Sequence, residues 1–222
     1  PDPRTPVSGG HLIAQLFEAA GLPAGVLGVM PGGADVGEAL ITAPEVGMVS
    51  FTGSAGAGRR VGELAARHLK KASLELGGTN SLVILDDADL DLAASNAAWG
   101  AWLHQGQICM ASNRVLVHES IAPTLIERLV AKATHRPVGE GATGRFPLGP
   151  LIDARQRDRV HQTVQEAVQA GAQLLAGGTY EGLFYRPTVL TGTRAGMRVH
   201  DEEVFGPVLN LNTFRNDDEA AE

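Results

Sequence analysis

The chain has 222 residues, of which 44% are apolar, 19% are charged and 28 are glycine, so it is long enough to bury one large core or two smaller ones. Its formal net charge of −7, with no basic run longer than two residues, excludes a protein that binds nucleic acid through clustered Lys and Arg. There is no apolar window of about 18 residues, no secretory leader and only one cysteine, so a cytoplasmic protein without membrane attachment or disulfides is expected.

Helix and strand signals alternate through the first part of the chain. An apolar stripe at helical spacing, ending at Gly21 and Pro23, predicts a helix within residues 5–25; its members are Leu12, Ile13, Leu16, Phe17 and Ala20. A strand at 25–30, a helix at 34–42, a strand at 47–51, a helix at 54–69 and a strand at 71–76 are then expected. This alternation is typical of an α/β protein with a parallel sheet and crossover helices.

A second α/β unit is expected after the Gly77-Gly78 pair, whose backbone freedom suits a junction between domains. Its strands are predicted at 81–86, 114–119, 173–178, 186–192 and 208–214, and its helices at 88–103, 121–134 and 155–172, with a loop at 135–153. The chain opens without Met and closes, at 216–222, on a stretch typical of a helix N-cap whose helix is not yet built. Both ends are therefore expected to be cut.

The segment Phe-Thr-Gly-Ser at 51–54 joins a predicted strand to a predicted helix. Free backbone N–H groups and a serine hydroxyl at a helix start favour a phosphate, so Gly53 and Ser54 are candidates for binding a pyrophosphate. The spacing is not the G-x-G-x-x-G fingerprint, and such turns are also common as plain connectors.

Glu75 lies near the end of a predicted strand, between Leu74 and Leu76 and before two glycines. Apolar neighbours are expected to desolvate its carboxyl partly, which would raise the pKa toward the value that a general base needs at neutral pH. The alternative is a strand-end glutamate that points into solvent.

Cys109 lies in the polar, glycine-containing stretch His-Gln-Gly-Gln-Ile-Cys at 104–109. A lone cysteine is often a small buried hydrophobe, but this one follows a turn that can hold the backbone open to a substrate. His104 is a weak candidate partner, because Cys-His pairs are formed by the fold and seldom by local spacing. The histidines show no metal-ligand spacing, and no metal is expected.

Three acids, Asp201 to Glu203, precede Val-Phe-Gly-Pro and a predicted strand. A carboxylate held at such an edge can accept both hydroxyls of a ribose. Acidic triplets are, however, usually solvated caps.

In this order, Phe-Thr-Gly-Ser, Leu-Glu-Leu-Gly-Gly, Gly-Gln-Ile-Cys and Glu-Glu-Val-Phe-Gly-Pro resemble the motif set of the NAD(P)-dependent aldehyde dehydrogenase superfamily, and the resemblance covers essentially the whole chain. It implies an aldehyde dehydrogenase-like α/β fold. Residues 1–77 would be the C-terminal part of a Rossmann-type dinucleotide-binding domain, and residues 78–222 a catalytic domain truncated at its C-terminus.

The resemblance also implies the chemistry. Cys109 would be the nucleophile that forms a thiohemiacetal and then a thioester, and Glu75 the general base. NAD or NADP would contact Gly53, Ser54, Leu76, Gly77, Glu203 and Phe205. The product would be the carboxylic acid of a small-molecule aldehyde, and the whole enzyme would be a homodimer or homotetramer.

The stretch around Cys109 resembles the benzaldehyde, salicylaldehyde and vanillin dehydrogenase group, which implies an aromatic aldehyde. Trp102, Leu103, Ile108 and Met110 stand where the family has substrate-pocket residues, and they form an apolar rim without a charged anchor.

Several departures from the family pattern leave alternatives open. The family's oxyanion-hole Asn and adenosine-ribose Lys would precede Pro1, and losing one oxyanion donor typically costs ~10²–10³ in rate. Pro3 stands where many NAD-preferring members have Glu, and Thr79 replaces a common Lys. The 222 residues alone could therefore be an inert piece with only a binding or assembly role. A coenzyme A-acylating enzyme would generally lack Glu75, and a Cys-His hydrolase would need no dinucleotide motifs.

Overall fold

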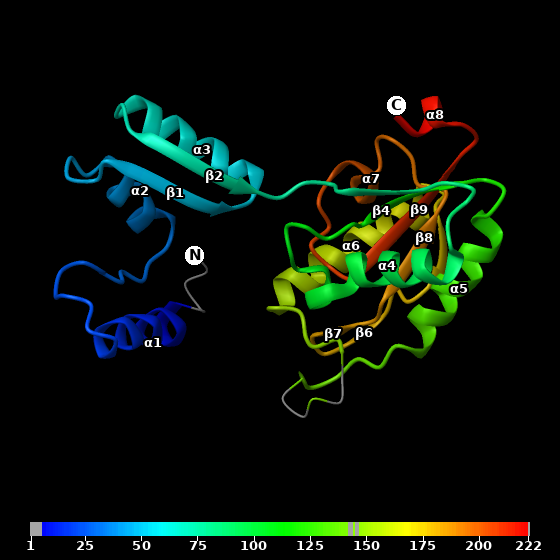
Figure 1. Ribbon diagram of the computed structural model, residues 1–222, viewed down its shortest axis with the longest axis horizontal. Helices are drawn as coiled ribbons and strands as arrows, with labels where there is room; N and C mark the ends of the chain where they lie inside the picture. Colours follow the sequence, from blue (N-terminus) through cyan, green and yellow to red (C-terminus); the bar gives the residue numbers. More distant parts are fainter. Residues whose placement is uncertain (1–5, 142–143, 145–146, 222) are drawn as a thin grey trace. The chain divides into compact units, whose positions relative to one another are not determined.

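The computed structural model describes residues 6–141, 144 and 147–221, which form two compact units, Pro1–Gly77 and Gly78–Glu222 (Figure 1). The first unit contains α1 (Pro6–Ala19), α2 (Ala34–Thr42), β1 (Met48–Gly53), α3 (Ala55–Arg67) and β2 (Lys71–Leu76). The expected helices and the two later strands of this unit are confirmed, within a few residues at their ends.

The first unit is built around a parallel strand pair. β1 and β2 pair from Met48↔Lys71 to Gly53↔Leu76, and α3 provides the crossover between them. A small core of Ile41, Val61, Leu64 and Ala65 joins α2 and α3 to the strand pair. Because the strands are parallel, their carboxyl ends lie at the same edge, so the two motifs that follow these strands are neighbours.

The strand predicted at 25–30 is not formed, and this expectation was wrong. Val26, Leu27 and Met30 are exposed, and no strand in the described part of the chain pairs with this segment. Apolar β-branched composition favours a strand, but the backbone groups of a strand need a ladder partner. The apolar stripe of α1 is likewise exposed at Leu12 and Leu16.

The second unit has a five-stranded sheet in the order β3-β4-β9-β8-β5. Its strands are β3 (Ser81–Ile84), β4 (Arg114–His118), β5 (Gln173–Ala176), β8 (Thr188–Thr191) and β9 (Val208–Phe214). The first four strands in this order run parallel, as predicted. β5 pairs antiparallel with β8, so the sheet is mixed and not wholly parallel.

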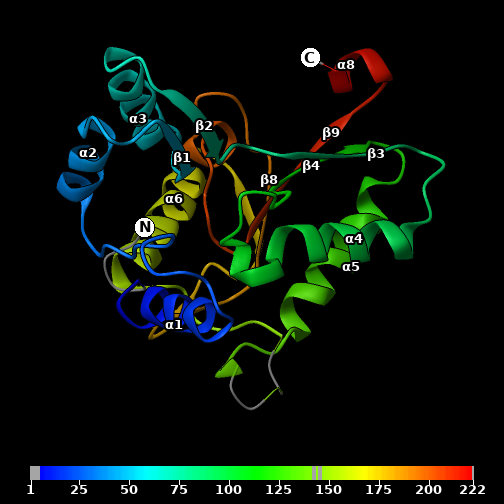
Figure 2. The ribbon, with the colours of Figure 1, turned by 60° about the vertical axis from the view of Figure 1, so that its left-hand side comes forward.

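Helices cover both faces of this sheet (Figures 1 and 2). Helices α4 (Leu90–Trp102) and α5 (Ala122–His135) pack on one face, and α6 (Ala154–Gln169) packs on the other. β9 serves both layers, since Val208 belongs to the α6 side while Leu209 and Leu211 belong to the α4–α5 side. This alternation is the period of two that a strand imposes on its side chains.

Four short elements were not predicted. They are the 3-10 helix η1 (Leu103–Gly106), the hairpin of β6 (Tyr180–Glu181) and β7 (Phe184–Tyr185), and the helix α7 (Arg198–Asp201). The closing stretch contains the predicted helix N-cap: Asn216 Oδ1 accepts from the Glu219 amide at 3.0 Å, and the short helix α8 (Asp217–Ala221) follows it. Part of the predicted 135–153 loop lies outside the described residues. None of the helices in the described ranges combines the length and the apolar character that crossing a bilayer requires.

Candidate active site

The Gly-Ser turn lies at the carboxyl edge of the β1–β2 pair. Ser54 is the N-cap of α3, and its Oγ accepts a hydrogen bond from the Ala57 amide at 3.3 Å. The amides of Ala55 and Gly56, in the first turn, have no intrahelical acceptor, as at every helix start. The predicted turn is therefore formed, with N–H groups directed out of the helix end.

Glu75 and Leu76 reach the same edge from β2. Leu76 pairs with Gly53, and a Cβ placed on Gly58 of α3 would be 2.5 Å from Leu76 Cδ2. The leucine side chain is thus held under α3, and Gly77 ends the unit. Glu75 is exposed, so the partial desolvation that the sequence suggested is absent from this structure; its apolar neighbours in sequence do not cover the carboxyl.

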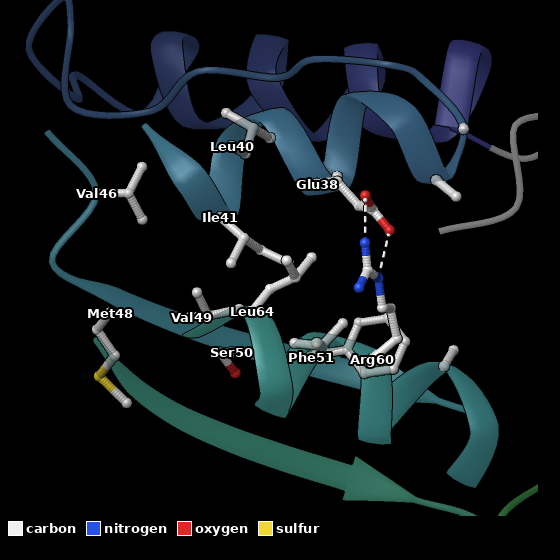
Figure 3. Close-up of a pocket in the computed structure, with 15 residues that line it drawn as sticks. Glu38, Leu40, Ile41, Val46, Met48, Val49, Ser50, Phe51, Arg60 and Leu64 are labelled. Atoms are coloured by element: carbon white, nitrogen blue, oxygen red, sulfur yellow. Dashed lines mark hydrogen bonds and ion pairs between the residues drawn. The ribbon is translucent and has the colours of Figure 1, made fainter. Parts of the chain in front are cut away.

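A cavity of about 650 Å³ opens between α2, β1 and α3 (Figure 3). Ile41, Val49 and Leu64 contribute to its mostly apolar lining. Glu38 of α2 and Arg60 of α3 form a bidentate ion pair across it, with Arg60 Nε 2.8 Å from Glu38 Oε1 and Nη2 3.1 Å from Oε2. This hydrogen-bonded pair lowers the pKa of Glu38. Helix α3 lines this cavity and also has the Ser54 turn at its N-terminus.

Cys109 is carried on a tight turn in the second unit. The Ala111 amide donates to Ile108 O at 3.0 Å, which closes the turn, and the cysteine is exposed. Asn80 Nδ2 donates to Cys109 O at 2.7 Å and to Ala111 O at 3.2 Å. Within the described ranges, the Cys109 amide has no acceptor. The Asn80 side chain therefore holds the turn, and the turn carries an exposed thiol beside an N–H group without an acceptor in the described ranges.

The Cys109 segment and the Val-Phe-Gly-Pro segment are in direct backbone contact. Gly106 has φ +67, and a Cβ at this residue would be 2.0 Å from Gly206 O. Gly206 is equally close to α6, since a Cβ there would be 2.5 Å from Val160 Cγ2. Glycine is required at both positions because any side chain would collide with a neighbouring segment.

Replacing Gly106 with alanine is expected to destabilise the protein by more than about 3 kcal/mol, because the new methyl group meets a backbone oxygen and the left-handed φ is strained. Urea unfolding monitored by fluorescence measures the loss. Gly141→Ala is the control, since no atom of the non-adjacent residues that the structure describes lies within 4 Å of its Cβ position, and it should change stability by less than about 0.5 kcal/mol. Equal stability of the two variants would contradict the close approach.

Glu203 is half-buried, and its Oε1 is buried without a hydrogen-bond partner in the described part of the chain. Burial raises the pKa of this carboxyl, while the positive charge of Arg159 and a hydrogen bond from the Gly78 backbone oppose the rise. Gly78 belongs to the Leu-Glu-Leu-Gly-Gly motif, so that motif also meets the acidic segment. A buried carboxylate oxygen without a partner suits a ligand hydroxyl.

Helix α6 holds the backbone beside Glu203. Gln156 Nε2 donates to Phe205 O at 2.9 Å and to Val204 O at 3.4 Å, and Arg159 Nη2 donates to Glu203 O at 3.1 Å. Phe205 has φ +53, an uncommon conformation for a residue with a side chain. The Gln156 amide fixes that conformation. These α6 residues were missed at the sequence level, because nothing local connects them to a segment more than 40 positions away.

The residues predicted to form the substrate rim are placed differently from one another. Met110 is 59% exposed, and Leu103 and Ile108 are half-buried. Trp102 is only 2% exposed and packs in the core between α4, α5 and the sheet, so its expected position on the rim is corrected: its side chain faces inward from the last turn of α4.

His104 is exposed and makes no hydrogen bond to Cys109 within the described residues. Pro3, where coenzyme preference was in question, lies outside the described residues. Three or more His, Cys, Asp or Glu side chains gather nowhere in residues 6–141, 144 and 147–221 as a metal ion would need.

Fold and site together define a class of α/β protein in which one sheet ends in a helix-capping Gly-Ser turn and a second sheet supports an exposed thiol on a turn. The chain belongs to the aldehyde dehydrogenase family, whose model matches residues 1–222.

Curated relatives agree with this assignment. The chain is 57% identical over 221 residues to a vanillin dehydrogenase of Amycolatopsis, and 49% identical over 222 residues to an NAD⁺ benzaldehyde dehydrogenase of Pseudomonas putida. In each case all of this chain aligns with 46% of the relative, so it spans about half the length of these proteins.

Solved structures share the fold. An NAD-dependent aldehyde dehydrogenase of Sinorhizobium meliloti matches with a TM-score of 0.93 at 39% identity, covering 96% of this chain and 43% of that one. A betaine aldehyde dehydrogenase of Staphylococcus aureus, in complex with NAD⁺, matches with a TM-score of 0.94 at 34% identity, covering 99% and 45%. The expected aldehyde dehydrogenase-like α/β fold is confirmed.

Proposed function

We propose that the protein oxidises an aromatic aldehyde to the carboxylic acid, with NAD⁺ or NADP⁺ as the electron acceptor and Cys109 as the covalent nucleophile. The observation that carries this proposal is the exposed Cys109 thiol on a turn, next to its own amide, which has no acceptor among the described residues. In this proposal the unit Pro1–Gly77 is part of a dinucleotide-binding domain, and the unit Gly78–Glu222 is part of a catalytic domain.

The chain's own residues account for the covalent steps. The Cys109 thiol loses its proton to solvent and its sulfur adds to the aldehyde carbon, while the Cys109 N–H stabilises the oxyanion that forms, as one donor of an oxyanion hole. A bound dinucleotide supplies the acceptor for the hydride that leaves this carbon. The resulting thioester is hydrolysed by a water whose proton Glu75 takes, which releases the acid and restores the thiol.

The residues present fit a dinucleotide. The start of α3, with Ser54 as its cap, offers amides to a pyrophosphate, and the apolar cavity beside the same helix suits a planar base. The buried, unpartnered Oε1 of Glu203 suits a ribose hydroxyl, and Phe205 follows it in the segment that Gln156 holds. Leu76 and Gly77 would contribute backbone groups at the end of β2.

The aromatic substrate class rests on the apolar side chains of Ile108 and Met110, which flank Cys109 in the sequence, on half-buried Leu103, and on relatives named for vanillin and benzaldehyde. An apolar rim gains free energy from burying an aromatic ring but offers no partner for a carboxylate. In the whole enzyme, a homodimer or homotetramer is proposed.

The proposal predicts a substrate order. In the longest reading frame that contains these 222 residues, kcat/KM for benzaldehyde should exceed that for acetaldehyde and for succinate semialdehyde, measured as NAD(P)H absorbance at about 340 nm. A higher value for either of the last two would end the aromatic assignment while leaving the oxidation itself intact.

A second candidate applies to the 222 residues taken alone, which cover 46% of the length of their relatives. The exposed apolar stripe of α1 favours a piece that associates and does not turn over. Adding NAD⁺ and benzaldehyde to the purified 222 residues separates the two candidates, and no signal is expected.

A further inference from the structure

Asn80 connects the end of the Leu-Glu-Leu-Gly-Gly segment to the turn that bears the thiol. Its side-chain amide spans two carbonyls of that turn, at 2.7 Å to Cys109 O and 3.2 Å to Ala111 O. Its backbone carbonyl accepts from the Arg114 amide at 3.3 Å, at the start of β4. The turn and the strand after it are therefore attached to one residue, which stands directly before β3.

Among the residues that the structure describes, Asn80 makes the one hydrogen bond to the peptide group that follows the cysteine. The Ala111 amide is used within the turn, and the Ser112 amide donates to Gly100 O at 3.0 Å. The peptide group is planar, so fixing the Cys109 carbonyl fixes the plane on one side of the cysteine Cα. The Cys109 Cβ and N–H are joined to this plane through the Cα, so fixing the plane restricts where the Sγ and the N–H can lie.

We infer that Asn80 is a positioning residue for the nucleophile. It orients the Cys109 turn so that the Cys109 sulfur can add to the carbonyl carbon of the aldehyde while the Cys109 N–H donates to the oxygen of the same carbonyl. This inference rests on the proposed function. It concerns geometry, since Asn80 acts through the backbone of Cys109 and touches no reacting atom.

An asparagine suits this task for a chemical reason. A primary amide has two N–H donors on one nitrogen, so one side chain satisfies two carbonyl oxygens. An aspartate has the same shape but, when ionised, only acceptors, so it would repel both oxygens. An alanine removes both donors, so neither carbonyl oxygen keeps its bond to this side chain.

The test compares Asn80→Ala and Asn80→Asp with Asn96→Ala, which removes an exposed asparagine from α4. Each is made in the longest reading frame that contains this chain. Reactive Cys109 is first counted by alkylation with iodoacetamide and peptide mass. The single-turnover rate of NAD(P)H formation is then measured per reactive thiol, at a pH where alkylation has reached its plateau, so that thiol ionisation does not contribute.

Both Asn80 variants should lose about 10–100-fold in rate per thiol, the size of effect expected for a misplaced reacting group. The KM for the dinucleotide should stay within about 2-fold of wild type, and Asn96→Ala should match wild type throughout. If the rate per thiol is unchanged, or if Asn80→Asp retains it, the inference is overturned. If only the number of reactive thiols or the melting temperature falls, Asn80 is merely structural and the inference also fails.

This outcome is separable from failure of the proposed function. Should Cys109→Ala retain wild-type turnover, the proposed function falls. Should Cys109→Ala be inactive while both Asn80 variants turn over normally, only the positioning role falls.

Discussion

Replacing Cys109 with alanine is expected to reduce aldehyde oxidation by at least about 10⁴-fold, because removing a covalent nucleophile removes the reaction path itself. The thiol is exposed, so the substitution creates no core cavity and should leave the melting temperature unchanged. The variant and wild type are compared as NAD(P)H formed from benzaldehyde in the longest reading frame that carries the chain.

Two controls make this result specific. Asn96→Ala on the exposed face of α4 should be indistinguishable from wild type. Dinucleotide binding by Cys109→Ala, followed by fluorescence quenching, should persist, because the Ser54 turn and the cavity lie in the other unit. Wild-type turnover by the alanine variant would refute the covalent route.

Local patterns predicted most of the elements that support the site. The alternation of apolar stripes and Gly or Pro breaks placed α2, β2 and β9 at the residues that the structure assigns to them. These patterns work because helix and strand periodicities are properties of a few neighbouring residues. The Ser54 cap is equally local, since its acceptor and donor are three positions apart.

What local patterns could not predict are the contacts between segments far apart in the chain. Asn80 meets the Cys109 turn 29 residues later, and Gln156 meets Phe205 after 49 residues. Trp102 was expected on the rim because it stands where the family has substrate-pocket residues, yet the last turn of α4 directs it into the core. The strand expected at 25–30 failed for the same reason, since a strand depends on a partner that its own residues do not specify.

The packing of the second unit explains why its motifs are spaced as they are. Gly78 reaches Glu203, Asn80 reaches Cys109, and Gly106 lies against Gly206, so segments from three motifs share one region. Gly106 and Gly206 allow the Cys109 segment to approach the Val-Phe-Gly-Pro segment closely. Asn80 connects the end of the Leu-Glu-Leu-Gly-Gly segment to the Cys109 turn.

Replacing Glu75 with glutamine is expected to leave a first turnover of about one NAD(P)H per reactive thiol and then to slow steady-state turnover by about 10²–10⁴-fold, the usual contribution of a general base. The amide cannot take a proton from the water that attacks the thioester, so the acyl enzyme accumulates. Stopped-flow absorbance at about 340 nm separates the burst from the steady state. The accumulated thioester is measured as added mass on the peptide that contains Cys109.

Exposure of Glu75 makes the result informative in either direction, because the substitution disturbs no buried contact of β2. Glu45→Gln, which changes another exposed acid of the first unit, is the matched control and should keep both phases. If Glu75→Gln loses the burst together with the steady state, Glu75 acts before the thioester, on the thiol itself. If both phases are unchanged, the base is another group, and the register that brings Glu75 to the edge next to Ser54 has a structural cause alone.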